Sequence, residues 1–214
     1  MHHLNYTLLQ DKQPVAVILR HAERYPVVDP LTHSSVLLTE KGLEDACSLG
    51  KTLSFLKPAA FYASPVTRCQ QTAEGIAKGI YNPDGTPPSV SFLYALAGPY
   101  IRGEWPEITR LVQIHGISTY LRMWFDGELP KDLVMPVEEA AHLEFNILKK
   151  QLEEHENAIN ITHDWNIMIM RQYFFNLRHE DIGYPDFLDG MTAYKENGKI
   201  CLAYHDHLQW VGIS

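Results

Sequence analysis

The chain has 214 residues, of which 45% are hydrophobic and 21% are charged, and its formal net charge is −8. This length and composition are typical of one globular domain with a sizeable core. The acidic balance argues against nucleic acid or an anionic membrane as a partner, and it makes any tight cluster of arginines unusual.

The cysteines and the N-terminal segment indicate the compartment. Cys47, Cys69 and Cys201 are far apart and lack CxxC spacing, so they predict neither a disulfide framework nor a zinc site. Residues 1–13 lack the apolar core of a signal peptide, and no apolar run approaches the roughly 18 residues of a membrane helix. We therefore expect a cytoplasmic protein that does not bind membranes.

The first half of the chain alternates short apolar runs with amphipathic segments. "PVAVIL" (14–19) and "AAFYA" (59–63) predict buried strands, and the apolar spacing within 37–56 predicts a helix between them. Ser64-Pro65 is typical of a helix start, with serine as the cap and proline in the first turn. "SVSFLYAL" (89–96) is a third candidate strand.

The second half begins with an irregular stretch, 98–136, which we expect to cover a site and to contain one helix between residues 107 and 125. Beyond it, the pattern predicts a helix, a strand, a second helix and a hairpin that turns at Asn197-Gly198. These four elements are predicted over 137–156, "NAINIT" (157–162), 166–177 and "TAYKENGKICLAY" (192–204).

Strands that alternate with helices predict a single α/β domain over residues 1–214. We expect a three-layer sandwich with a mostly parallel central sheet and helices on both faces. Ligands of such sheets bind beyond the carboxyl ends of the strands. Three predicted strands end there on polar residues: Arg20-His21, Ser64 followed by Arg68, and His163-Asp164. These residues are expected to form one site.

The residue types at this rim suit a phosphoryl group. Guanidinium forks match phosphate oxygens, and several cations around one point stabilise the charge on a phosphoryl group during its transfer. The candidates for this pocket, which we expect to hold phosphate or sulfate, are Arg20, Arg24, Arg68, His21 and His163.

Two residues of the rim are candidates for the chemical step. His21, at a strand end, is a candidate nucleophile, because neighbouring guanidinium charges favour its neutral form. Asp164 is the carboxyl group that the pattern puts at the same rim. A bound phosphate dianion favours the protonated form of a nearby carboxyl group, so Asp164 suits the role of general acid.

Four segments resemble the histidine phosphatase superfamily. "RHAERYP" (20–26) resembles the RHGxRxP signature of its acid phosphatase branch, and "THDWNI" (162–167) resembles the HD motif of that branch. "LLTEKGLEDACSLGKTL" (37–53) and "YASPVTRCQQTAE" (62–74) are similar to two further segments, and all four occur in family order. The resemblance implies a phosphoglycerate mutase-like fold and no requirement for a metal or cofactor.

The resemblance also implies roles for individual residues. His21 would become phosphorylated and Asp164 would donate the proton, with His163 in the catalytic site. The phosphate pocket would consist of Arg20, Arg24, Arg68 and His163.

The chain departs from the family pattern in two ways. Ala22 stands where the family usually has glycine, and a methyl group there is expected to crowd the backbone turn or the ligand. The chain also has the size of the mutase-like branch, which takes its acid from a glutamate after the third strand. The nearest position here is Ala95, and Glu104 is the only carboxylate in that stretch. We favour Asp164 as the acid and keep Glu104 as the alternative.

Four further residues have two interpretations each. Trp165 either forms a wall of the substrate pocket or packs in the core. Arg102 is a candidate for contact with a second anionic group on the substrate, but a solvated surface arginine is the favoured interpretation. His205 and His207, in "YHDHL" (204–208), have strand spacing, which would suit a metal site, but an exposed terminal strand is the favoured interpretation.

The sequence thus predicts a metal-independent phosphatase that acts on a phosphomonoester. Its substrate would be a small phosphorylated metabolite or a phosphorylated protein side chain. Two other functions stay open: a phosphoglycerate-type mutase, and a catalytically silent phosphate-binding scaffold. No particular oligomeric state is predicted.

Overall fold

A seven-stranded sheet forms the centre of the protein, whose computed structural model describes residues 9–27, 30–81, 86–154 and 157–212. The strands are β1 (Val15–Arg20), β2 (Ala60–Ala63), β3 (Val90–Phe92), β4 (Ala158–Thr162), β5 (Gly190–Glu196), β6 (Lys199–Tyr204) and β7 (His207–Gly212). Their order across the sheet is β3-β2-β4-β1-β5-β6-β7.

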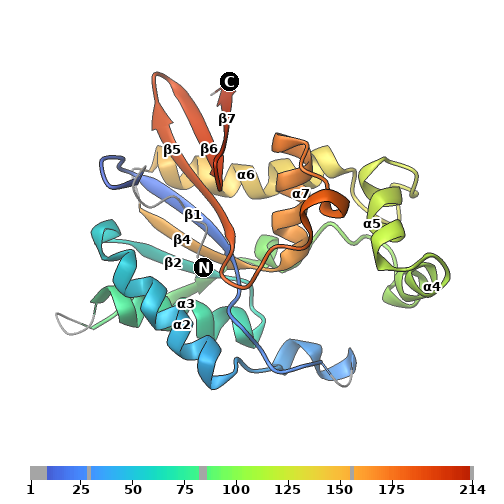
Figure 1. Cartoon of the computed structure of the whole chain (residues 1–214), viewed down its shortest axis with the longest axis horizontal. Helices are drawn as coiled ribbons and strands as arrows, with labels where there is room; N and C mark the ends of the chain where they lie inside the picture. The colour runs from blue at the N-terminus through green and yellow to red at the C-terminus, as the bar shows by residue number, and fades with distance from the viewer. Residues whose placement is uncertain (1–8, 28–29, 82–85, 155–156, 213–214) are drawn as a thin grey trace.

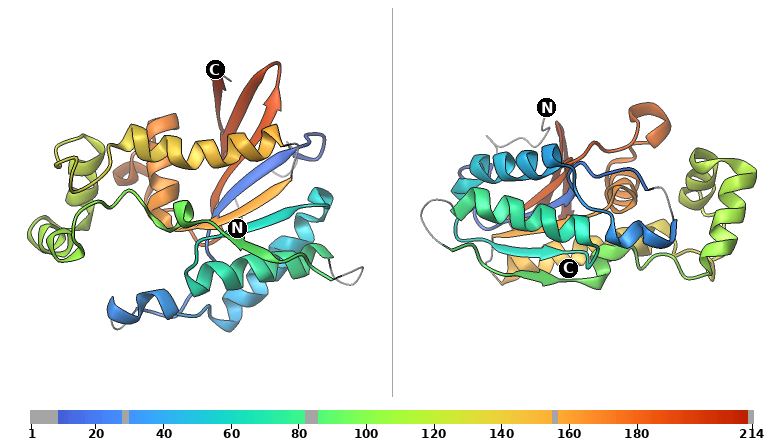
Figure 2. Two further views of the ribbon diagram at one scale, coloured as in Figure 1. Left: turned by 180° about the vertical axis from the view of Figure 1, so that it is seen from behind. Right: turned by 90° about the horizontal axis from the view of Figure 1, so that it is seen from below.

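Helices cover both faces of this sheet. They are α2 (Glu40–Thr52), α3 (Thr67–Tyr81), α4 (Trp105–His115), α5 (Ile117–Phe125), α6 (Val137–Glu153), α7 (Asp164–Phe175) and α8 (His179–Ile182). Short 3₁₀ helices occupy Pro30–Ser35, Ser54–Leu56 and Tyr94–Ala97. Figures 1 and 2 show α2 and α3 on one face and α6 and α7 on the other, with α4 and α5 to one side. Within the described residues, no helix is long and apolar enough to cross a membrane.

The central strand β1 shows why the layers form. Its side chains alternate between two cores: Val15, Val17 and Leu19 pack with α2 and α3, whereas Ala16 and Ile18 pack with α6 and α7. An apolar strand buried on both faces requires a helix layer on each side. The predicted three-layer sandwich is therefore confirmed.

The sheet is mostly but not entirely parallel. β3, β2, β4 and β1 pair in parallel, whereas β5 pairs antiparallel with β1, and β6 and β7 follow as consecutive antiparallel hairpins. Asn197 and Gly198 both have positive φ, as a tight hairpin requires. His205 also has positive φ and turns the chain into β7. His205 and His207 therefore do not lie on one strand, and the interpretation of 204–208 as a single strand is wrong.

The segment from 98 to 136 contains two helices, so the expectation of one helix is wrong. Helix α4 ends before Gly116 and α5 begins after it. At Gly116 φ is +79°, a conformation in which a residue with a side chain would be strained. Tyr120 and Trp124 of α5 pack with Met168 and Ile169 of α7 in a third apolar cluster. The two helices are thus attached to the side of α7.

Glycines allow α2 and α3 to pack closely. A Cβ atom on Gly79 would lie 2.2 Å from the carbonyl oxygen of Cys47, and one on Gly50 would lie 2.2 Å from that of Ile76. The backbones of the two helices therefore touch without side chains between them. This contact fixes the position of α3, whose first turn carries Arg68.

The carboxyl ends of β1, β2 and β4 meet at one edge of the sheet. Arg20 pairs with Thr162, and Ala63 pairs with Ile161. The residues that follow these three strands are therefore neighbours, as the strand pattern predicts.

Candidate active site

A pocket of about 220 Å³ lies beyond these strand ends. It combines imidazole, guanidinium and carboxyl groups with aromatic rings. Its described lining consists of His21, Arg24, His33, Val66, Arg68, Ala97, Tyr100, Trp105, His163, Asp164 and Trp165.

His21 is held in one tautomer. It is buried at the end of β1, and its backbone N–H donates to the carbonyl of Thr162 on β4 at 3.0 Å. Its Nδ1 lies 2.8 Å from the carbonyl oxygen of Ala22, which can only accept, so Nδ1 carries the hydrogen. Its Nε2 lies 3.0 Å from Nε of Arg68, which can only donate. The lone pair of His21 is therefore on Nε2.

Arg68 connects both histidines of the site. Besides the contact with His21, its Nη2 lies 3.2 Å from Nδ1 of His163, and its Nη1 donates to the carbonyl of His33 at 2.7 Å. Since Nδ1 of His163 must accept, its Nε2 donates to Oγ of Ser64 at 3.0 Å. Ser64 also accepts the N–H of Val66 at 3.4 Å, so it lies in the turn that precedes α3 and orients His163. The helix begins at Thr67, so the prediction of Ser64 as its cap, with Pro65 in its first turn, is wrong.

Burial keeps both imidazoles neutral. Desolvation lowers the pKa of His21 to about 2, although the hydrogen bond to Ala22 opposes this, and the positive charge of Arg68 adds to the lowering. Desolvation followed by the charge of Arg68 lowers the pKa of His163 to about 3. A neutral imidazole with a free lone pair is the form that can act as a nucleophile.

Asp164 lines the pocket and is the first residue of α7. Its Oδ1 accepts the N–H of Trp165 at 2.9 Å, and its Oδ2 lies 3.2 Å from Nη2 of Arg20. Arg20 also donates to the carbonyl of Pro185 at 2.6 Å, and its guanidinium lies 4.4 Å from the ring centroid of Phe187. Arg20 is not one of the described residues that line the pocket, so here it contacts the candidate acid and not the pocket surface.

Arg24 lines the pocket and has unused donor capacity. Its Nη1 donates to the carbonyl of Tyr25 at 2.8 Å, but its buried Nε has no hydrogen-bond partner among the described residues. The buried Nε of Arg20 also has no hydrogen-bond partner among the described residues. An unpaired buried donor costs about 1–3 kcal/mol, which an acceptor such as a phosphate oxygen would offset.

Alanine fits at position 22, contrary to the expected crowding. Ala22 is fully buried and packs in the core cluster of β1, α2 and α3. Its φ is not in the left-handed region, its N–H donates to Oγ1 of Thr72 at 3.0 Å, and its carbonyl accepts from His21. The backbone here therefore does not require glycine.

The remaining candidates separate into two groups. Trp165 lines the pocket and also packs 6.0 Å from Trp124 between ring centroids, so both of its interpretations hold. Arg102 pairs with Glu139 at 2.5 Å, and Glu104 is exposed at the start of α4. Neither Arg102 nor Glu104 is among the described residues that line the pocket.

A chain of buried polar groups that was not predicted from the sequence lies beside the pocket. The hydroxyl of Tyr100 donates to Oδ1 of Asn166 at 3.1 Å, and Nδ2 of Asn166 donates to Glu144. Burial raises the pKa of Glu144 to about 8, although the bond from Asn166 opposes this. One signal was present: Glu144 lies four residues after Ala140 and four before Leu148, on the apolar face of α6.

Part of the chain is similar to a known protein family. The family described as histidine phosphatase superfamily (branch 1) has a sequence model that matches residues 16–85, about a third of the chain. The resemblance to the histidine phosphatase superfamily is confirmed. The matched stretch contains His21, Arg24 and Arg68, whereas the HD motif, at His163-Asp164, lies outside it. A search of the curated proteins finds no match.

Solved structures of histidine phosphatases and mutases share the fold. A phosphoserine phosphatase mutant from Entamoeba histolytica, in complex with phosphoserine, is 17% identical, with 90% of this chain and 96% of that chain covered and a TM-score of 0.58. Phosphoglycerate mutase from Bacillus anthracis is 12% identical, with 95% and 94% covered and a TM-score of 0.57. Mycobacterial glucosyl-3-phosphoglycerate phosphatase, in complex with inorganic phosphate, is 13% identical, with 92% and 93% covered and a TM-score of 0.55. At these identities the likeness establishes the fold alone.

The protonation state of the two histidines can be measured directly. We expect the Cε1 chemical shifts of His21 and His163 to stay at the values of neutral imidazole between about pH 5 and 8. The pKa of His21 is lowered to about 2 and that of His163 to about 3, so both rings are neutral throughout this range. NMR titration of protein with labelled histidines tests this, and His21→Gln and His163→Gln variants assign the signals. A midpoint near the ordinary pKa of about 6.5 for either residue would contradict the proposed electrostatics.

Proposed function

We propose that the protein hydrolyses phosphomonoesters through a phosphohistidine formed on Nε2 of His21. Asp164 acts as the general acid, and no metal is needed. The observation that carries this proposal is the tautomer of His21, whose Nδ1–H is bound to Ala22 while the Nε2 lone pair meets Arg68 in the pocket. The superfamily match over residues 16–85 and the shared fold support it.

Substrate binding must first release the lone pair of His21. The Nε–H of Arg68 is donated to Nε2 in this structure, so a phosphoryl oxygen has to replace Nε2 as its acceptor. This exchange is favourable because a hydrogen bond from an arginine to an anionic oxygen is stronger than one to a neutral imidazole. Arg24, which has an unused buried Nε–H, supplies a second cation to the same group.

The chemical step then transfers the phosphoryl group. A bond forms between Nε2 of His21 and phosphorus while the bond from phosphorus to the leaving oxygen breaks, and that oxygen takes a proton from Asp164. The phosphorylated ring is cationic, and the hydrogen bond from its Nδ1–H to Ala22 stabilises this charge. Water next attacks phosphorus and gives a proton to the Asp164 carboxylate, which restores His21 and releases phosphate.

The substrate is a small phosphorylated molecule or a phosphorylated protein side chain. The pocket of about 220 Å³ has room for a phosphoryl group and part of a leaving group. A mutase of the phosphoglycerate type is the alternative, since such a mutase has the same fold. A silent phosphate-binding scaffold is disfavoured, because Ala22 fits its site and leaves the histidine tautomer intact.

Hydrolysis of p-nitrophenyl phosphate tests the proposed function. We expect release of phosphate between about pH 4 and 8 that persists in EDTA and falls by at least a factor of about 10³ in His21→Ala, because that variant lacks the nucleophile. His115→Ala is the matched control, because His115 is exposed at the end of α4. Loss of activity in EDTA would contradict the metal-independent mechanism, and absence of turnover would favour the scaffold or a narrow mutase.

The role of Asp164 predicts a dependence on the leaving group. Asp164→Asn should lower kcat/KM for an alkyl phosphate by a factor of about 10² to 10⁴, but kcat/KM for p-nitrophenyl phosphate far less. This parameter reports the transfer of the phosphoryl group to His21, in which p-nitrophenolate leaves without a proton. The ratio of the two kcat/KM values measures this. Glu104→Gln is the companion variant and should leave the ratio unchanged. Equal loss on both substrates in Asp164→Asn, or a changed ratio in Glu104→Gln, would move the acid role away from Asp164.

A further inference from the structure

The pocket has a second side, which the phosphoryl chemistry does not use. His21, Arg68 and His163 lie beyond the ends of β1, β2 and β4, and Arg24 and His33 come from the segment between β1 and α2. The described lining that remains is mainly aromatic, and it consists of Tyr100, Trp105 and Trp165, with Val66 and Ala97 beside them. This side is where the leaving group of a bound phosphomonoester has to lie.

Two of the three rings form a fixed wall. Trp165 packs against Tyr120 and Trp124, with ring centroids 6.1 and 6.0 Å away, and Tyr100 packs 5.0 Å from Trp124. The hydroxyl of Tyr100 is bound to Asn166 inside the protein. Tyr100 therefore lines the pocket while its hydroxyl is bound inside the protein.

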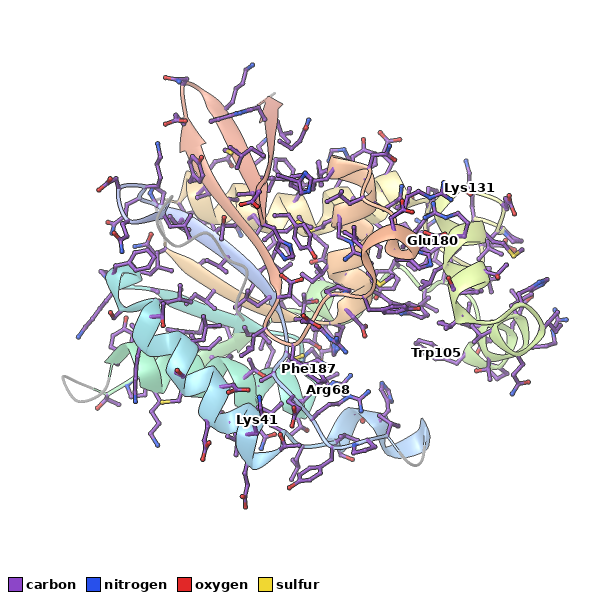
Figure 3. All side chains as sticks on the ribbon, viewed as in Figure 1. Lys41, Arg68, Trp105, Lys131, Glu180 and Phe187 are labelled. Carbon is purple, nitrogen blue, oxygen red and sulfur yellow. The ribbon has the colours of Figure 1, made fainter. Side chains whose placement is uncertain are left out.

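The third ring, Trp105, is still available for contact. It is the first residue of α4, lines the pocket, and is 59% exposed. Figure 3 shows it projecting from α4 toward the main body of the protein, on the side where Arg68 and Phe187 lie. An exposed indole that faces a pocket gains free energy when a flat apolar group covers it, at about 25 cal/mol for each Å² of apolar surface.

The charges of this side disfavour an acidic leaving group. Apart from Arg24 and Arg68, the described residues that line the pocket include no lysine or arginine. Arg102 is turned to Glu139, and Asp164 adds a carboxyl group to the pocket. A carboxylate on the leaving group would therefore lie near Asp164 and the aromatic rings with no lysine or arginine of its own, which disfavours its binding.

We propose that the site selects phosphomonoesters whose leaving group is an uncharged aromatic ring that packs against Trp105 and Trp165. The preference in turnover rests on the proposed function. The preference in binding does not, because a ligand that is never hydrolysed would show it too. The ring belongs either to a free aryl or arylmethyl phosphate or to a phosphotyrosine side chain, which share this chemistry.

Binding of phosphonates, which are not hydrolysed, tests the ring preference by itself. We expect benzylphosphonate to bind at least about tenfold more tightly than ethylphosphonate in titration calorimetry, because only the former buries an aromatic ring. Trp105→Ala should bring this ratio close to one. Trp210→Ala is the matched control, since Trp210 is an exposed tryptophan on β7, and it should keep the ratio. Equal binding of the two phosphonates, or an unchanged ratio in Trp105→Ala, would overturn the inference.

Turnover separates this inference from the proposed function. Benzyl phosphate and ethyl phosphate release alcohols of similar acidity, so a kcat/KM ratio of about ten or more in favour of benzyl phosphate reports ring recognition. A higher kcat/KM for 3-phosphoglycerate than for benzyl phosphate would overturn the inference and leave hydrolysis standing. No hydrolysis of any ester, with the phosphonate preference intact, would refute the proposed function and leave the inference standing.

Two further substrates distinguish the sources of the ring. Phenyl phosphate is compared with a peptide that contains one phosphotyrosine. A higher kcat/KM for the peptide would identify a protein side chain as the source, and a higher value for phenyl phosphate would identify a free aryl ester.

Discussion

The site depends on how the ring of His21 is held at both of its nitrogens. The carbonyl of Ala22 fixes the hydrogen on Nδ1, and Arg68 meets the lone pair on Nε2. Ala22 lies two residues after the end of β1, and its N–H is bound to Thr72 of α3. Arg68 lies in the first turn of α3, which close packing on α2 holds in place. If either contact were lost, the imidazole could rotate or change tautomer, and the other groups of the site would no longer face a nucleophile.

The same arrangement explains why a cationic cluster is tolerated inside an acidic protein. Burial keeps both imidazoles neutral, so the arginines do not face further positive charges at neutral pH. Each arginine has local acceptors: Arg20 has Asp164 and a carbonyl, Arg24 has a carbonyl, and Arg68 has three. These contacts hold the cluster in the absence of an anion, and a phosphoryl group can replace some of them. The pocket is thus built before substrate arrives, which reduces the cost of ordering it on binding.

Much of the fold and the centre of the site followed from local sequence. Apolar runs that end on Arg20-His21 and on His163-Asp164 defined strand ends, and parallel pairing brings such ends together. Contacts formed by the rest of the chain were not predictable in this way. The pattern could not show that Arg20 would turn to Asp164 and Pro185, because the loop that supplies Pro185 comes from far along the chain. The aromatic side of the pocket depends on how α4 and α5 attach to α7, which has no local signal apart from the glycine between them.

The central claim, that His21 carries the phosphoryl group, can be tested in the Asp164→Asn variant with p-nitrophenyl phosphate. Phosphorylation of the enzyme does not need the acid with this substrate, whereas the attack of water loses its base, so the intermediate should accumulate. The measurement is mass spectrometry of peptides after an alkaline quench, which preserves phosphohistidine. The account predicts a phosphoryl group on the peptide that contains His21, and none after the same treatment of a variant that also carries His21→Ala. A phosphoryl group on another residue, such as Ser64, or turnover without any phosphorylated peptide, would contradict it.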